Sequence, residues 1–186
     1  MKKILLICLI IGMAMPSRAA HIVGGEMLYE YVGPGLNPNT SLYIITLKLF
    51  RDQTTTGANM PNNVFIGIFN NDNGAQFPGI NQPYDVVKSA EVPVQVDPLP
   101  PCINNAPILD YNVGIFILHV TLPNTVKGYT ASYQTCCRVN PLANVFNAPG
   151  VGGTGSTYSC SIPGKPDTSP FFSTSIDAIC RQKHFT

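Results

Sequence analysis

The segment Gly128–Asn140 (GYTASYQTCCRVN) alternates between apolar and polar side chains and ends in two adjacent cysteines. Alternation with a period of two is typical of a half-buried β-strand. Because neighbouring strand residues point to opposite faces of a sheet, Cys136 and Cys137 are expected to bond to different partners rather than to each other. The segment therefore predicts a β-rich chain that folds where cysteines are oxidised.

The N-terminal segment predicts the same environment. Lys2 and Lys3 precede an uncharged apolar run from Ile4 to Met15, and the small-residue site Ser17-Arg18-Ala19 follows. This is the pattern of a secretory signal peptide, with cleavage expected after Ala19. Residues 1–19 are thus predicted to be removed. No second apolar run approaches membrane length, so we expect a secreted or cell-surface protein without membrane insertion after cleavage.

Charge and composition argue against a nucleic acid partner and against a fold built from long helices. The chain has 11 Lys and Arg and 10 Asp and Glu, and removal of the basic residues in the signal segment leaves it slightly acidic. It has no basic stripe, so no nucleic acid partner is expected. Charged residues make up only 11%, against 16 Gly and 17 Pro, which disfavours long solvated helices.

Several segments carry the alternation of strands. Leu42–Arg51 is the clearest, and weaker strands are predicted at Glu26–Val32, Val64–Asn70, Glu91–Asp97 and Ser156–Ile162. The side chains predicted to face a core are Tyr43, Ile45, Leu47, Leu49, Phe116, Leu118, Val120, Tyr129 and Tyr133. Lys48, His119 and Gln134 lie on the opposite phase, and we expect them to be exposed.

Gly- and Pro-rich turns between short strands predict the architecture. We expect an all-β fold, an antiparallel Ig-like or fibronectin-III-like β-sandwich of about seven strands, stapled by disulfides. The sandwich domain is predicted to span residues 20–165. Residues 166–186 are predicted to be a C-terminal segment that starts a further module.

The segment Leu122–Gly128 permits a more detailed prediction. It has the composition of a turn between adjacent antiparallel strands, with Leu122 facing Gly128. This register would bring the double cysteine near the Pro-rich loop that carries Cys102. Tyr129 has two interpretations, which stay open: the tyrosine of a sandwich corner, with its hydroxyl bonded to nearby backbone, or an ordinary core tyrosine.

Five cysteines follow the signal segment, and outside the cytoplasm they are disulfide candidates: Cys102, Cys136, Cys137, Cys160 and Cys180. The hairpin register predicts a bond from Cys102 to one of the adjacent pair. The other member is expected to bond to Cys180 or Cys160. An odd count leaves one thiol free or bonded outside this chain.

Signals of catalysis or metal binding are weak. Ile22-Val-Gly-Gly25 resembles the activated N-terminus of a trypsin-like protease, but the nucleophile segment of such an enzyme is missing. Asp72-Asn-Gly74 lacks the spaced acids of a calcium loop, so a hairpin turn is expected there. Asp52 beside Arg51 is expected to be a strand-end charge pair. We predict no catalytic, cofactor-binding or metal site, and no enzymatic activity.

An ordered set of short motifs carries a family resemblance. His21-Ile-Val-Gly-Gly-Glu26, Tyr43–Asp52, Pro101-Cys102, Leu122-Pro123, Gly128-Tyr129 and Cys136-Cys137-Arg138 follow one another, and Ser169-Pro170-Phe171 and Ile179-Cys180 continue the series. The chain resembles the N-terminal region of large secreted surface proteins of gliding Bacteroidetes. Those proteins are adhesin-like, with Ig-like or PKD-like modules and a gliding-motility-associated sorting domain for type IX secretion.

The resemblance has departures that affect the cysteines. Gln53 stands where relatives have a cysteine, a second cysteine is missing around Ile108-Leu109-Asp110, and Cys160 is unusual. No disulfide pairing is therefore transferred from relatives.

Two functions are expected from these observations. The first is a non-enzymatic extracytoplasmic surface module with a role in cell adhesion or in the structure of the envelope or matrix. Its partners would be other surface proteins or extracellular polysaccharide, with no cofactor. The alternative is a glycan-binding module of a secreted multidomain protein. The absence of Trp and the inward phase of most Tyr and Phe count against this alternative.

Overall fold

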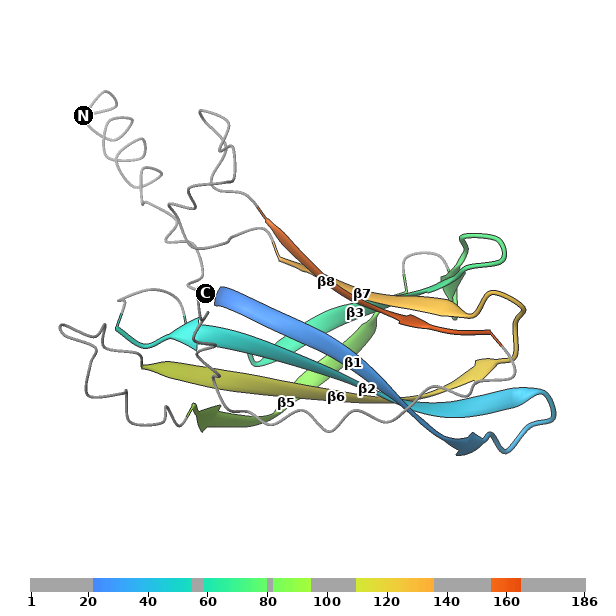
Figure 1. Cartoon of the computed structure of the whole chain (residues 1–186), viewed down its shortest axis with the longest axis horizontal. Coiled ribbons are helices and arrows are strands. Elements are labelled where there is room, and N and C mark those ends of the chain that lie inside the picture. The colour runs from blue at the N-terminus through green and yellow to red at the C-terminus, as the bar shows by residue number, and fades with distance from the viewer. Residues whose placement is uncertain (1–21, 55–58, 80–81, 95–109, 136–154, 165–186) are drawn as a thin grey trace, which may run out of the picture.

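The computed structural model describes residues 22–54, 59–79, 82–94, 110–135 and 155–164. This part of the chain forms eight β-strands, drawn as arrows in Figure 1. The strands are β1 (Ile22–Pro34), β2 (Thr40–Asp52), β3 (Asn63–Asn70), β4 (Gln76–Phe77), β5 (Tyr84–Pro93), β6 (Tyr111–Pro123), β7 (Tyr129–Thr135) and β8 (Ser156–Ile162). The all-β prediction is confirmed. The signal segment 1–19 and the C-terminal segment 166–186 lie outside the described residues.

All strand pairs are antiparallel and follow the order β1-β2-β6-β5-β3-β7-β8, with β4 beside β3. Two central strands change partner along their length. The start of β5, Tyr84–Val87, pairs with β3, and its later part, from Lys88, pairs with β6 across a bulge. In β3, Asn63–Ile66 pairs with β5, whereas Gly67–Asn70 pairs with β7. These changes turn the sheet back on itself.

The curled sheet is nearly barrel-shaped. In Figure 1, β7 and β8 lie above β1, β2 and β6, and β3 and β5 pass between these two groups. The two ends of the strand order approach each other, since the Tyr158 ring of β8 lies 2.9 Å from where a Cβ on Gly25 of β1 would be. One hydrophobic core fills the interior, and every strand of the described part except the two-residue β4 contributes a buried side chain to it.

The predicted register of the strongest strand is confirmed. Tyr43 is 4% exposed, and Ile45, Leu47 and Leu49 are fully buried. Phe116, Val120 and Tyr129 are also buried, and His119 and Gln134 are exposed as expected. Leu118 and Tyr133 are only partly buried, although both pack against the core.

Lys48 was predicted to be exposed, and this is wrong. It is 8% exposed because its ammonium group forms an ion pair with Glu26 on β1, with 2.8 Å between Nζ and Oε1. Lys48 faces Glu26 on one side and Ile115 on the other, so its aliphatic stem covers the outer surface of the sheet. The predicted strand Glu91–Asp97 is misplaced as well, since β5 begins at Tyr84 and ends at Pro93.

The prediction of a hairpin between Leu122 and Gly128 is wrong. β6 pairs with β2 and β5, whereas β7 pairs with β3 and β8. The connection after Pro123 therefore carries the chain from one group of strands to the other. The physical reason is burial: Ala131 of β7 lies opposite Ile68 of β3, and both side chains are fully buried.

A tyrosine corner, meaning a tyrosine hydroxyl bonded to backbone a few residues upstream, holds this crossing, and the same Tyr129 ring belongs to the hydrophobic core. Its hydroxyl donates a hydrogen bond to the Pro123 carbonyl oxygen at 2.9 Å. The ring is buried and packs edge-on against Phe77. Gly128 has φ of 74°, and a Cβ there would overlap the Ile162 carbonyl oxygen, so only glycine fits between the corner and β8.

The β3–β4 turn also packs on the corner. The Asp72 carboxylate accepts hydrogen bonds from the backbone amides of Val126 at 3.0 Å and Lys127 at 2.8 Å. The backbone N–H of Asn71 donates to the Gly128 carbonyl oxygen. The turn from Asn70 to Gly74 thus closes a short hairpin, as the sequence predicts, and its aspartate binds backbone amides of the corner.

We expect two isoleucines on neighbouring strands to differ sharply in their effect on stability. Ile45 of β2 is fully buried, whereas Ile117 of β6 is 39% exposed on the outer surface. Ile45→Ala should lower the free energy of unfolding by about 2–5 kcal/mol through lost burial and the cavity left behind. Ile117→Ala should change it by about 0.5–1 kcal/mol. Urea denaturation measures both, and equal losses would contradict the register of the two strands.

Removal of the corner hydroxyl should destabilise the fold. Tyr129→Phe keeps the ring but leaves the Pro123 carbonyl without its donor, at a cost of about 1–3 kcal/mol. Tyr158→Phe is the matched control, because Tyr158 stacks on Tyr133 through its ring. The control should cost less than about 0.5 kcal/mol.

Burial raises the pKa of Tyr129, so the free energy of unfolding should fall as the pH rises above the ordinary value of 10.0. The fall should be smaller in Tyr129→Phe, which lacks the hydroxyl that titrates.

Candidate functional site

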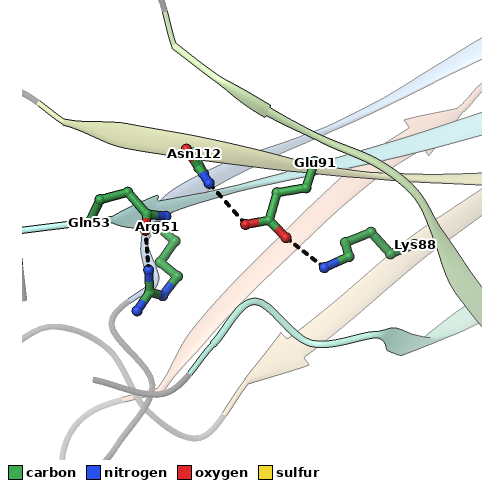
Figure 2. A network of polar contacts seen from close by, with 5 residues as sticks. All are labelled: Arg51, Gln53, Lys88, Glu91 and Asn112. Atoms are coloured by element: carbon green, nitrogen blue, oxygen red, sulfur yellow. Dashed lines mark hydrogen bonds and ion pairs between the residues drawn. The ribbon is translucent and has the colours of Figure 1, made fainter. Parts of the chain in front are cut away.

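A network of polar side chains lies where β2 and β5 end and β6 begins (Figure 2). Lys88 forms an ion pair with Glu91, with 2.6 Å between Nζ and Oε2. The Asn112 amide donates to the other carboxylate oxygen of Glu91 at 3.0 Å. On β2, Arg51 donates to the Gln53 side-chain oxygen at 2.6 Å. Three strands thus bring two cations close to one carboxylate.

The sheet register explains why these side chains meet. Arg51 lies opposite Asn112 across the β2–β6 pair, and Glu91 lies opposite Gly114 across the β5–β6 pair. Met60 fills the space over Gly114, with its Sδ 2.7 Å from where a Cβ would be. Because Met60 belongs to the hydrophobic core, the network borders the core at this end of the sheet.

The electrostatics of Glu91 limit the chemistry of this network. The hydrogen bond from Lys88 lowers the pKa of Glu91 most, and the bond from Asn112 lowers it further; the Arg51 charge adds to the effect. A carboxylate held ionised by two donors is a poor general acid at neutral pH and a weak base. The arrangement is therefore suited to joining strand ends, not to proton transfer.

An open depression of about 410 Å³ lies at the opposite end of β2. It is lined by the β1–β2 loop from Pro34 to Ser41 and by Asn124. Two hydrogen bonds stabilise its wall: the Thr40 hydroxyl donates to the Asn37 carbonyl within the loop at 2.6 Å, and the Ser41 hydroxyl donates to the Asn124 amide oxygen, just after β6, at 2.7 Å. These bonds hold the conformation of the loop.

Of the five disulfide candidates, only Cys160 lies within the described residues, and Cys102, Cys136, Cys137 and Cys180 lie outside them. Cys160 is a free thiol in the middle of β8, opposite Ala131. Burial raises its pKa to about 12, so the reactive thiolate is scarce at neutral pH. The bond from Cys102 to the adjacent pair stays a prediction, but the hairpin register that motivated it is wrong.

The residues weighed as catalytic or metal signals are not brought together. Ile22 is buried at the start of β1, and the Asp72 carboxylate binds the backbone amides of Val126 and Lys127. Asp52 accepts hydrogen bonds from the amide and hydroxyl of Thr54, which caps the end of β2. Among the residues that the structure describes, no three His, Cys, Asp or Glu side chains are grouped to hold a metal ion. The same residues include no helix long and apolar enough to cross a membrane.

Sequence reasoning missed both the Lys88–Glu91–Asn112 network and two outward phenylalanines, Phe65 and Phe69 of β3. The phenylalanines could have been found from the alternation of β3. Val64, Ile66 and Ile68 occupy the buried phase, so Phe65 and Phe69 must point outward. The network was hidden because the bulge between Lys88 and Ala90 breaks the period of β5.

Comparisons with known proteins supply no relative: no protein-family model matches the chain, and neither the curated proteins nor the solved structures include a significant match.

Neutralisation of Glu91 should have a small effect that depends on pH. The pair with Lys88 is partly exposed, so Glu91→Gln should cost less than about 1 kcal/mol at pH 7. Since the folded-state pKa is below the ordinary 4.5, the contribution is present above that pH and is lost as the pH falls through the folded value. Urea denaturation from pH 7 to 2 should show a shallower acid decline in Glu91→Gln. An unchanged acid decline would mean that the pair adds no stability.

Proposed function

We propose that the chain is an exported, non-enzymatic surface module built as an Ig-like β-sandwich, with an adhesive or structural role in the cell envelope or matrix. The observation that carries this proposal is the strand order around the tyrosine corner. Divided at the β5–β3 junction, the order reads β1-β2-β6-β5 and β3-β7-β8. With β4 set aside, this matches the A-B-E-D and C-F-G sheets of immunoglobulin domains, whose corner tyrosine opens strand F as Tyr129 opens β7.

The chemistry of the described residues supports a module that binds rather than catalyses. Its best-organised charged cluster holds Glu91 ionised between donors, which suits a structural joint. Ig-like sandwiches commonly serve as cell-surface modules. Together with the signal segment and the resemblance to surface proteins of gliding Bacteroidetes, this favours other surface proteins or extracellular polysaccharide as partners.

One observation favours the second candidate, a glycan-binding module. Phe65 and Phe69 of β3 are 57% and 38% exposed on the outer surface, against the expectation that most aromatic side chains face inward. Apolar side chains that lie close together on an exposed face can form a binding site, and these two lie four residues apart on the same side of one strand.

Export is the first property to test. The full chain with a C-terminal epitope tag is expressed in a gliding Bacteroidetes host, beside a variant that lacks residues 2–19. We expect the tag of the full chain to be outside the cytoplasm, with an N-terminus at Ala20, and the variant to stay inside. Fractionation and N-terminal sequencing measure this. A full chain retained in the cytoplasm with its first residues intact would contradict the proposal.

A further inference from the structure

The outer surface of β3, β7 and β8 has an unusual composition. Its outward side chains come from the phase opposite to the buried Ile68, Ala131 and Ile162. We call the nine residues of this phase the hydroxyl face: Phe65, Gly67 and Phe69 on β3, Thr130, Ser132 and Gln134 on β7, and Thr157, Ser159 and Ser161 on β8. None of them is ionisable, and six of the nine are Ser, Thr or Gln.

The pairing of the strands arranges these side chains in rows across the sheet. Ser132 lies opposite Gly67 on one side and Ser159 on the other. Thr130 lies between Phe69 and Ser161 in the same way. Gln134 is paired with Thr157. In each row, β7 and β8 contribute hydroxyl or amide groups. Two of the rows continue onto β3, the strand that carries the two phenylalanines.

Most of these polar groups are available to a ligand. The Thr130 hydroxyl is used, since it donates to the Asn71 side-chain oxygen at 2.9 Å. Within the described part of the chain, the side chains of Ser132, Gln134, Thr157, Ser159 and Ser161 form no hydrogen bond with another protein group. Gln134, Thr157, Ser159 and Ser161 are exposed.

The two phenylalanines give the face an apolar edge. The Phe69 ring lies over Gly67, with its Cε2 3.0 Å from where a Cβ would be, so the absent side chain makes room for the ring. Coverage of a strand glycine by an aromatic ring stabilises a sheet, and this accounts for Phe69. It does not account for Phe65, which is 57% exposed.

We propose that the hydroxyl face binds a chain of neutral polysaccharide. Exposed hydroxyl and amide groups both donate to and accept from sugar hydroxyls, and a phenylalanine ring offers a flat apolar surface to the C–H groups of a pyranose. None of the nine residues is a Lys or Arg, so an acidic polymer would gain no ion pair with them. Asp85 of β5 lies opposite Phe65 and accepts a hydrogen bond from Asn63 at 2.7 Å, and its charge would repel an acidic polymer.

A neutral sugar also fits this surface better than a protein does. Protein interfaces are depleted in serine and usually centre on apolar or Arg anchors. Here the aromatic rings lie along one strand, and hydroxyl groups fill the other two. The inference rests on the proposed function, because polysaccharide is one of the two partner classes expected of a surface module.

Native affinity electrophoresis of the mature chain, residues 20–186, tests the face. Gels contain laminarin, dextran, mannan or galactomannan as neutral probes, and alginate as an acidic one. We compare the unchanged chain with Phe65→Ala/Phe69→Ala, Phe65→Tyr/Phe69→Tyr and Ser159→Lys. Ile117→Ala, an exposed apolar change on β6 outside this face, is the control. Unfolding midpoints are measured in parallel.

At least one neutral polysaccharide should retard the unchanged chain more than alginate does. The double alanine variant and Ser159→Lys should each weaken binding by roughly tenfold or more, whereas the tyrosine variant and Ile117→Ala should keep it within about threefold. Ser159→Lys changes the β8 side of the hydroxyl face and leaves both phenylalanine rings in place, so it tests whether the serines also contribute to binding. Retardation by no neutral probe, or equal retardation of the double alanine variant, would overturn the proposal.

Sedimentation velocity tests whether the hydroxyl face instead binds a second copy of the chain. Self-association of the unchanged chain that disappears in the double alanine variant would assign the face to a second copy and overturn the polysaccharide. Failure of any of these tests would leave export and protein-mediated adhesion in place. Retention of the chain in the cytoplasm would remove the proposed surface function even if purified protein bound sugar.

Discussion

The crossing of the chain from β6 to β7 is the constraint on which the rest of the structure depends; burial of Ile68 and Ala131 favours it, and the hydrogen bond from the Tyr129 hydroxyl to the Pro123 carbonyl holds its corner. This bond lies at the point where the chain leaves the strands that pair with β2 and joins those that pair with β3. Three separate segments close around it: the corner itself, the β3–β4 turn through Asp72, and the end of β8 through the close approach of Ile162 to Gly128. Without the crossing, β7 would have no place opposite β3, and the hydroxyl face would not form.

The local sequence pattern was sufficient to predict a strand and its inward side chains where buried and exposed residues alternate strictly. The inward phase of β2 was predicted correctly, and β8 has the predicted bounds, Ser156–Ile162. Prediction failed where a bulge interrupts the period, as between Lys88 and Ala90 of β5. It failed again at Lys48, because the alternation pattern assigns a charged residue to the surface and says nothing of an ion pair with Glu26 on the neighbouring strand.

The hairpin was the most consequential error, and its cause is physical. A short Pro- and Gly-containing segment such as Pro123–Gly128 is compatible both with a hairpin and with a crossing to a distant position in the same sheet. The choice between them is made by long-range burial of residues such as Ile68 and Ala131, which no local pattern reveals. The candidate ligand surface was hidden for the same reason. Only the assembled order β3-β7-β8 places Phe65 and Phe69 on the same surface as the serines of β8.

The crossing can be measured directly by nuclear Overhauser effects between backbone protons of the mature chain. The observed strand order predicts cross-strand contacts between Ile68 and Ala131 and between Ile45 and Leu118. It predicts no backbone contact between Val120 and Thr130. A backbone contact between Val120 and Thr130, with none between Ile68 and Ala131, would restore the β6–β7 hairpin and contradict both the tyrosine corner and the face that depends on it.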